Sequence, residues 1–364
     1  MDFDPNQIEL AAARLSKGGL VAFPTETVYG LGADALNEGA VRRVFEAKGR
    51  PAQNPLIVHV TGVEMAAGLV SGPLSESAIA LMRTFWPGPL SIVLPKHARI
   101  PAIVTGGSGS DSVALRCPDH PVALALLFAF GGPLVGPSAN RSGGVSPTTA
   151  EHVRAEFDPA TAMVLDGGNC QTGIESTVIS LHDTGAAEGG ATILRPGVIG
   201  AEQLAAVLDM PVGFSPGPAD AGAAALRNGV ATPLPSPGLL ASHYAPRART
   251  VLFSDWQELE ELADDAAARG SVQPAPLAVL SHSLLAEESD LPRGARLLRL
   301  PATPHDYAAA LYRTLREADT PETSVIAVHR PPPPHPPFAA TPEDSAVWQA
   351  VHDRLARACA PRAR

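Results

Sequence analysis

Short apolar runs alternate along the chain with segments whose apolar positions recur every three or four residues. The runs Leu20 to Phe23 and Leu56 to Val60 predict buried strands. Between them, Asn37 can cap a helix with apolar residues at helical spacing, and Gly49 can end it. Asp4 followed by a proline starts an earlier helix in the same way. Strands that alternate with helices predict an α/β fold.

The same patterns extend this alternation through the first two hundred residues. Further strands are predicted at residues 90–94, 113–115, 163–165, 178–181 and 192–194, and further helices at residues 62–70, 75–85, 121–130 and 201–208. The alternation restarts near residue 249, with strands at 250–253, 277–280 and 324–328 and helices at 255–268, 305–318 and 342–359. This second series predicts a smaller Rossmann-like α/β domain. No GxGxxG follows its first strand, so dinucleotide binding is not implied.

The stretch between the two series is rich in proline, glycine and alanine, which is typical of a linker. We therefore expect a first domain at 1–210, a linker at 211–246 and a second domain at 247–364. A length of 364 residues agrees with two domains.

Composition excludes several classes of protein. With 45% apolar and 18% charged residues the chain is expected to be globular, and its net charge of −10 argues against a protein that coats nucleic acid. Three cysteines without a CxxC pair disfavour a disulfide framework and a structural zinc site. The N-terminus lacks the features of a signal peptide, and no apolar run reaches the ~18 residues of a membrane span. A soluble cytoplasmic protein is expected.

Polar and charged residues gather around the first two strands. The first strand opens into Thr25-Glu26-Thr27, Lys48 and Arg50 flank the glycine that ends the helix, and His59 is the one polar member of the second strand. Each feature also has an ordinary explanation. Threonines in turns bond their own backbone, cations complement a helix C-terminus, and a single histidine in a strand is commonly a core residue. Their occurrence within about forty residues favours a functional site at a strand end.

Three further features extend this prediction. Arg116 follows an apolar strand, where a guanidinium can bind a carboxylate in bidentate fashion. Residues 136–149 form a loop of hydroxyls and glycines suited to phosphate oxygens, although an ordinary helix-capping loop has the same composition. The Gly/Ser loop at 105–111 is weaker evidence, because it lacks GK[ST] and a flexible loop explains it equally well.

The motifs PTETVYGLG, AKGRP, NPLIVHV and PSAN, in this order, resemble those of the YrdC-like threonylcarbamoyl-AMP synthases. The resemblance covers residues 5 to 210 closely and implies a YrdC-like twisted mixed sheet with flanking helices. Longer, two-domain members of this family also carry a segment similar to SPG…HYAP, which folds over the active site. In this chain Leu239 to Ser242 depart from the basic and aromatic residues usual there.

The resemblance implies a synthase that joins L-threonine, bicarbonate and ATP into threonylcarbamoyl-AMP and pyrophosphate, with Mg2+. Its catalytic residues would be Lys48 and Arg50. L-threonine would contact Thr27, His59, Arg116 and Ser176. ATP would contact Lys48, Arg50, Asn54, Ser112, Ser138, Asn140, Ser146, Arg195, His243 and Tyr244. The product would pass to a threonylcarbamoyl transferase complex that modifies tRNA next to the anticodon. Direct tRNA binding is expected to be weak, and no membrane partner and no metal-ligating residue are expected.

Two other functions stay open at this point. An RNA-binding module of the same fold could hold RNA in a basic pocket, although the acidic total argues against it. A carbamoyltransferase of hydrogenase maturation contains a related domain, but its Cys-rich zinc motifs are absent here. No Ser/His/Asp triad spacing points to hydrolysis, and a binding role is expected for His59 rather than that of a general base.

Overall fold

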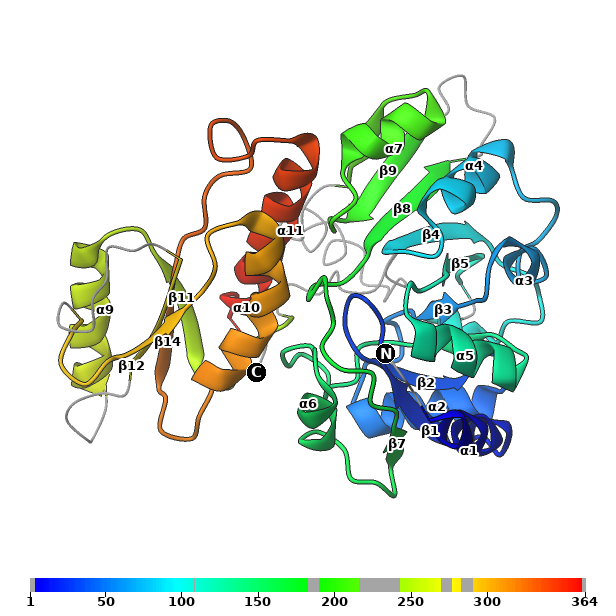
Figure 1. Cartoon of the computed structure of the whole chain (residues 1–364), viewed down its shortest axis with the longest axis horizontal. Helices are drawn as coiled ribbons and strands as arrows, with labels where there is room; N and C mark the ends of the chain where they lie inside the picture. The colour runs from blue at the N-terminus through cyan, green and yellow to red at the C-terminus, as the bar shows by residue number, and fades with distance from the viewer. Residues whose placement is uncertain are drawn as a thin grey trace. The chain divides into compact units, whose positions relative to one another are not determined.

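The computed structural model describes residues 4–107, 109–182, 190–215, 243–269, 277–282 and 291–361. They form two compact units (Figure 1). The first unit holds the described residues up to Ser215 apart from Gly143–Val145, and the second holds those three together with the described residues from His243 onward. Most of the expected linker, including Leu239–Ser242, lies outside the described residues. The expected domain boundaries therefore stay predictions.

The first unit is built on a mixed ten-stranded sheet in the order β10-β9-β8-β4-β5-β3-β6-β2-β1-β7. Its strands are β1 (Leu20–Phe23), β2 (Gly30–Asp34), β3 (Ile57–His59), β4 (Leu90–Pro95), β5 (Ser112–Arg116), β6 (Leu134–Val135), β7 (Ala162–Val164), β8 (Thr177–His182), β9 (Gly190–Arg195) and β10 (Val212–Phe214). At its centre β5 runs parallel to β3 and antiparallel to β4. The expected α/β class with a mixed sheet is confirmed.

Three helix ends of this unit lie where the sequence predicted capping residues. The helices of the unit are α1 (Pro5–Ser16), α2 (Glu38–Lys48), α3 (Val63–Ala67), α4 (Glu76–Phe85), the 3-10 helix η1 (Ala102–Thr105), α5 (Pro121–Phe130), α6 (Ala150–Arg154) and α7 (Ala201–Leu208). The Asp4 side chain accepts a hydrogen bond from the first turn of α1, and Asn37 does the same for α2. Gly49 ends α2 with a φ of 61°, a left-handed conformation that glycine adopts without strain.

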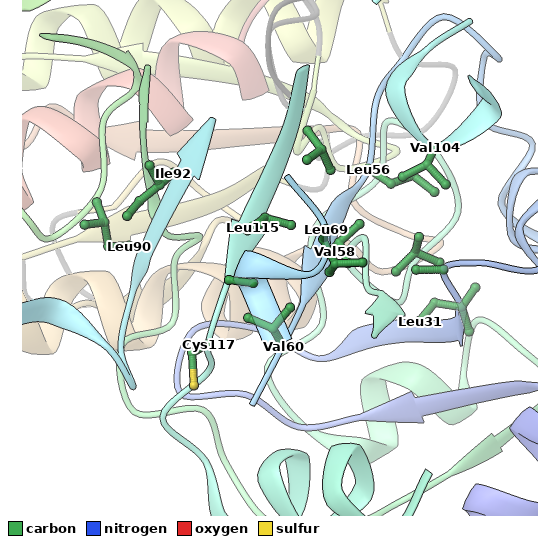
Figure 2. Packing of buried hydrophobic residues seen from close by; sticks show 14 of the residues in the cluster. Leu31, Leu56, Val58, Val60, Leu69, Leu90, Ile92, Val104, Leu115 and Cys117 are labelled. Atoms are coloured by element: carbon green, nitrogen blue, oxygen red, sulfur yellow. The ribbon is translucent and has the colours of Figure 1, made fainter. Parts of the chain in front are cut away.

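Successive side chains along each strand point to opposite faces of the sheet, so each face has its own core cluster. On β1, Leu20 and Ala22 join a core cluster with α2 and α4, whereas Val21 and Phe23 join a second cluster with α1 and α5. Figure 2 shows part of the first cluster, to which Val58 and Val60 around β3 and Leu115 and Cys117 around β5 belong. Residues between these apolar positions therefore point to the opposite face. His59 and Arg116 are such residues.

Strand β2 was not predicted, because Gly30 and Gly32 break the apolar pattern that marks the other strands. A Cβ atom at Gly32 would lie 2.9 Å from the Phe23 ring and 2.9 Å from the Val21 carbonyl oxygen. The aromatic ring of β1 thus occupies the space that a side chain on β2 would need. Glycine is required here for packing, although its low strand propensity hides the strand.

The second unit contains a four-stranded parallel sheet in the order β11-β14-β12-β13. Its strands are β11 (Arg249–Phe253), β12 (Leu277–Ser281), β13 (Arg296–Arg299) and β14 (Val325–His329), and its helices are α9 (Trp256–Arg269), α10 (Pro304–Ala318) and α11 (Pro342–Ala358). Helix α9 lies on one side of the sheet, and α10 and α11 lie on the other (Figure 1). The expected Rossmann-like layer is confirmed, and only β13 was not predicted. No helix in the described ranges is long and apolar enough to cross a membrane.

Two imidazole rings stack at the carboxyl ends of neighbouring strands in this unit. The rings of His282, after β12, and His329, at the end of β14, lie 4.6 Å apart at an angle of 18°. On its other side His329 stacks on Phe253 at 5.2 Å. Burial, together with the neighbouring His329, lowers the pKa of His282 to about 4, and burial also lowers the pKa of His329.

Because the folded state lowers the pKa of both histidines, we expect the second unit to lose stability in acid. An unfolded histidine has a pKa of about 6.5, so the neutral folded pair contributes its full stability above that value and loses it as the pH falls towards 4. Differential scanning calorimetry at pH 7 and pH 5 should show His282→Phe losing less stability than the wild type, by about 1 kcal/mol or more. His305→Gln changes an exposed histidine and serves as the control. Equal losses in all three proteins would contradict the prediction.

Candidate active site

Polar side chains from four neighbouring strands form a buried row on one face of the first sheet. The parallel register of β3 and β5 places His59 opposite Arg116. On β4, Ser91 comes directly before Ile92, the partner of Leu115. Its hydroxyl lies 2.8 Å from that of Ser176, which comes just before β8. All four side chains are buried. The register thus brings together three residues that the sequence predicted for threonine, and adds Ser91.

The turn after β1 adds two hydroxyls and a carboxylate to this row. The Thr25 hydroxyl accepts hydrogen bonds from the backbone of Thr27 and Val28 and donates one to the Val28 carbonyl oxygen, which fixes the turn. The hydroxyls of Thr25 and Thr27 lie 2.9 Å apart. The Glu26 carboxylate lies 2.7 Å from the Arg116 guanidinium, and both side chains are at least nine-tenths buried. The sequence indicated that a carboxylate stands at this strand end but predicted no role for it.

His59 is an uncharged hydrogen-bonding group at neutral pH. Its ring packs edge-on against Phe23, with ring centres 5.5 Å apart. A Cβ atom at Gly136 would lie 2.7 Å from the imidazole, so this glycine makes room for the ring. Burial, followed by the charge of Arg116, lowers the pKa of His59 to about 3. Its Nδ1 atom has no hydrogen-bond partner among the described residues. A buried polar atom of this kind is a candidate ligand contact.

Lys48 joins the end of α2 to the PSAN loop. Its Nζ atom donates to the carbonyl oxygens of Ser138 and Asn140, at 2.5 Å each. In return the backbone N–H of Ser142 donates to the Lys48 carbonyl oxygen. Burial, followed by the charge of Arg50, lowers the pKa of Lys48 well below its usual value. Lys48 thus positions this loop in the structure. Its predicted catalytic role and its contact with ATP stay predictions.

Two further residues predicted to contact the nucleotide, Arg50 and Asn54, come before the start of β3, whereas His59 stands at its end. Arg50 donates to the carbonyl oxygens of Asn54 and Pro55, at 3.2 and 2.8 Å. Both polar side-chain atoms of Asn54 are buried and have no hydrogen-bond partner within the described part of the chain. Ser112 begins β5 and Arg116 ends it. These two residues are therefore separated by ~13 Å, four strand residues, which leaves room for two different parts of a ligand.

Two more residues predicted to contact the nucleotide, Ser146 and Arg195, form hydrogen bonds with Glu175 and Ser176. The Ser146 hydroxyl donates to Glu175 at 2.6 Å. Arg195, expected at the nucleotide, donates to the Ser176 carbonyl oxygen and hydroxyl at 3.0 to 3.1 Å. In this structure Arg195 therefore positions Ser176, and its nucleotide contact stays a prediction. The sequence predicted no role for Glu175, although it stands next to Ser176, because a lone carboxylate has no pattern of its own.

His243 and Tyr244 belong to the second unit. The Tyr244 ring stacks on Tyr312 at 5.6 Å, the Arg354 guanidinium lies 5.4 Å from its centre, and only 1% of the residue is exposed. Its φ of 61° is a left-handed conformation that is uncommon outside glycine. His243 packs edge-on against this ring. The contacts that the sequence predicted between these two residues and ATP stay predictions.

Two buried thiols lie near the same site. Burial raises the pKa of Cys117 to about 11 and that of Cys170 to about 12. Both are therefore protonated at neutral pH and unsuited to act as nucleophiles. In the described residues no group of three or more His, Cys, Asp or Glu side chains suits a metal ion.

Known proteins match both units. A family model for Sua5, YciO and YrdC, described as telomere recombination, matches residues 13–197, and one for the C-terminal domain of threonylcarbamoyl-AMP synthase matches residues 199–360. The threonylcarbamoyl-AMP synthase of Bacillus subtilis is 46% identical over 246 residues, which cover 67% of this chain and 66% of that protein. The Pyrococcus abyssi synthase is 44% identical over 246 residues, covering 68% of this chain and 67% of the relative.

The crystal structure of P. abyssi Sua5 complexed with L-threonine has the same fold. It matches this structure with a TM-score of 0.79 at 35% identity, over 99% of this chain and 96% of that one. This agreement confirms the family that the four motifs indicated. The chain belongs to the YrdC-like threonylcarbamoyl-AMP synthase family, in its longer two-domain form.

Proposed function

We propose that this chain is an L-threonylcarbamoyladenylate synthase, a nucleotidyltransferase that makes threonylcarbamoyl-AMP and pyrophosphate from L-threonine, bicarbonate and ATP. The observation that carries the proposal is the buried row on β3 and β5, where a guanidinium and an uncharged imidazole occupy paired positions. These groups suit a small molecule with a carboxylate and neutral polar groups. The P. abyssi relative whose structure contains L-threonine has the same fold.

The chemistry needs positioning more than an activated protein nucleophile. Threonine's ammonium and bicarbonate give a carbamate, a water molecule and a proton, and a carbamate oxygen then attacks the α-phosphorus of ATP as pyrophosphate leaves. Arg116 would bind threonine's carboxylate, while Thr27, His59 and Ser176 would contact its other polar groups.

The nucleotide would lie along the remaining predicted contacts. Lys48 would keep the PSAN loop in place, so that the side chains of this loop reach the phosphates. The nucleotide contacts of the first unit would be Arg50, Asn54, Ser112, Ser138, Asn140, Ser146 and Arg195, and those of the second His243 and Tyr244.

A Mg2+ ion would arrive with the triphosphate. This ion usually keeps several waters and binds through one or two carboxylates plus substrate phosphates, so it needs no dedicated ligand set. The described residues fit that requirement, because the buried Glu175 carboxylate accepts a hydrogen bond from Ser146, a predicted nucleotide contact. Bound there, the ion would neutralise part of the phosphate charge.

The product would be consumed by a second protein. A carbamoyl group joined to AMP is an activated acyl donor. We propose that a threonylcarbamoyl transferase complex transfers the threonylcarbamoyl group from this donor to tRNA in the cytoplasm. The RNA-binding alternative receives no support from the geometry. Lys48, Arg50, Arg116 and Arg195 are at least nine-tenths buried, so they cannot follow a nucleic-acid backbone across a surface.

Pyrophosphate release from ATP and bicarbonate tests the proposal. With L-threonine the rate should exceed the rate without an amino acid at least about tenfold, with L-serine falling between, because serine has the same polar groups as threonine but lacks its methyl group. Mass spectrometry should detect an AMP-linked product. Release that ignores the amino acid would indicate plain ATP hydrolysis and would contradict the proposed function. Absence of release together with salt-dependent tRNA binding would favour an RNA-binding module.

A further inference from the structure

Glu26 is a buried carboxylate to which the proposed function above gives no task. Its Oε1 atom lies 2.7 Å from the Arg116 guanidinium, and the two side chains are 9% and 5% exposed. The Glu26 backbone carbonyl accepts a hydrogen bond from Thr172, and Arg116 Nε donates to the Gly88 carbonyl oxygen. Both charged groups therefore stand at fixed places on the face of the sheet that carries His59.

The structure of the turn does not explain this glutamate. The Thr25 hydroxyl, with bonds to Thr27 and Val28, already fixes the backbone, so the Glu26 side chain is not needed to shape it. Stability does not explain it either. A buried ion pair loses about as much free energy by desolvation as it gains by attraction, and an apolar pair in the same space is often as stable. A ligand that needs both charges is a better explanation.

A free amino acid has the matching charges. Its carboxylate and ammonium are one carbon apart, and the Glu26–Arg116 pair offers one charge opposite to each of them, 2.7 Å apart. The uncharged His59 ring adds no charge of its own at neutral pH. The site stays neutral if the substrate carboxylate replaces Glu26 on Arg116 and the ammonium then binds the released Glu26 carboxylate. An arginine alone would attract any small carboxylate equally well.

We propose that Glu26 binds the ammonium group of the amino-acid substrate and makes the site specific for a zwitterion over other carboxylates. The inference rests on the proposed function, since it assumes that threonine binds at Arg116. Glu26 belongs to the ligand-free site as the partner of Arg116 and to the occupied site as the partner of the substrate.

The test compares two ligands on the same protein. L-Threonine and (R)-3-hydroxybutyrate differ only in the α-amino group, and isothermal titration calorimetry gives a dissociation constant for each. The wild type should prefer threonine by about 10- to 100-fold, the usual value of a hydrogen bond to a charged group. Glu26→Gln should lower this preference to less than about threefold, because only threonine loses a partner. Glu26→Asp, which keeps the charge, should recover part of the preference.

The ratio of the two dissociation constants distinguishes a binding role of Glu26 from a structural role. If Glu26→Gln merely disturbs Arg116 or the fold, both ligands weaken together and the preference stays, which overturns the inference. A wild type that binds threonine and releases pyrophosphate, with a Glu26→Gln variant of unchanged preference, also overturns it and leaves the proposed function intact. A wild type that does not bind threonine overturns both.

Discussion

Lys48→Met is expected to lower threonine-dependent pyrophosphate release at least about 100-fold, the usual loss when a positioned charged donor is removed from an active site. Methionine has a similar length and fills the space of the buried side chain, but it cannot donate to the carbonyl oxygens of Ser138 and Asn140. Each carbonyl left without a donor costs about 1–3 kcal/mol. The PSAN loop should then lose its fixed position beside α2, and with it the predicted contacts to ATP.

Arg141→Met is the matched control for Lys48. Arg141 also links this loop to α2, because its guanidinium donates to the Ala47 carbonyl oxygen at 3.2 Å, but it is exposed. Loss of one exposed hydrogen bond should change the activity less than about threefold. Both variants are compared by kcat, by the KM for ATP and by thermal midpoint. A Lys48→Met enzyme as active as Arg141→Met would show that the buried amine is not required.

The helices of the first unit were predictable because their signals are local. Asp4, Asn37 and Gly49 cap helices through contacts within four residues, so the sequence alone contains the evidence. His59 and Arg116 were predictable as site residues because His59 is the one polar member of an apolar run and Arg116 directly follows another. The contact of Lys48 with carbonyl oxygens about ninety residues away was not, since every residue has a carbonyl and no side-chain pattern marks the acceptor.

Other features depended on packing that a pattern does not contain. Gly32 breaks the apolar pattern of β2 because the Phe23 ring needs its space. The pairing of Glu26 with Arg116 joins residues ninety positions apart, and it follows from the order of strands in the sheet rather than from either motif. Ser91 was hidden in an apolar strand for the same reason, since only the register shows that it faces Ser176.

Arg116→Met is expected to lower both the stability of the protein and its affinity for L-threonine. A double variant, described below, distinguishes the causes of the two losses. Removing the guanidinium leaves the Glu26 carboxylate buried without its counter-charge, which typically costs 3–5 kcal/mol, so the free energy of unfolding should fall by about that amount. Affinity for L-threonine should fall by about 100-fold, because a charge-assisted contact with its carboxylate is lost. Chemical denaturation at pH 7 and titration calorimetry measure the two quantities.

The double variant Glu26→Gln/Arg116→Met assigns each effect to its cause. Without either charge the buried pair carries no uncompensated carboxylate, so stability should return to within about 1–2 kcal/mol of the wild type. Threonine affinity should stay low, because both groups that match the zwitterion are gone. Arg154→Met is the control, since it breaks the exposed ion pairs with Glu151 and Asp166 and should cost less than about 1 kcal/mol. If the double variant bound threonine as the wild type does, the amino acid would bind elsewhere. If Arg116→Met were as stable as Arg154→Met, the buried carboxylate would have another partner, and the paired charges would no longer explain why both residues stand at this strand end.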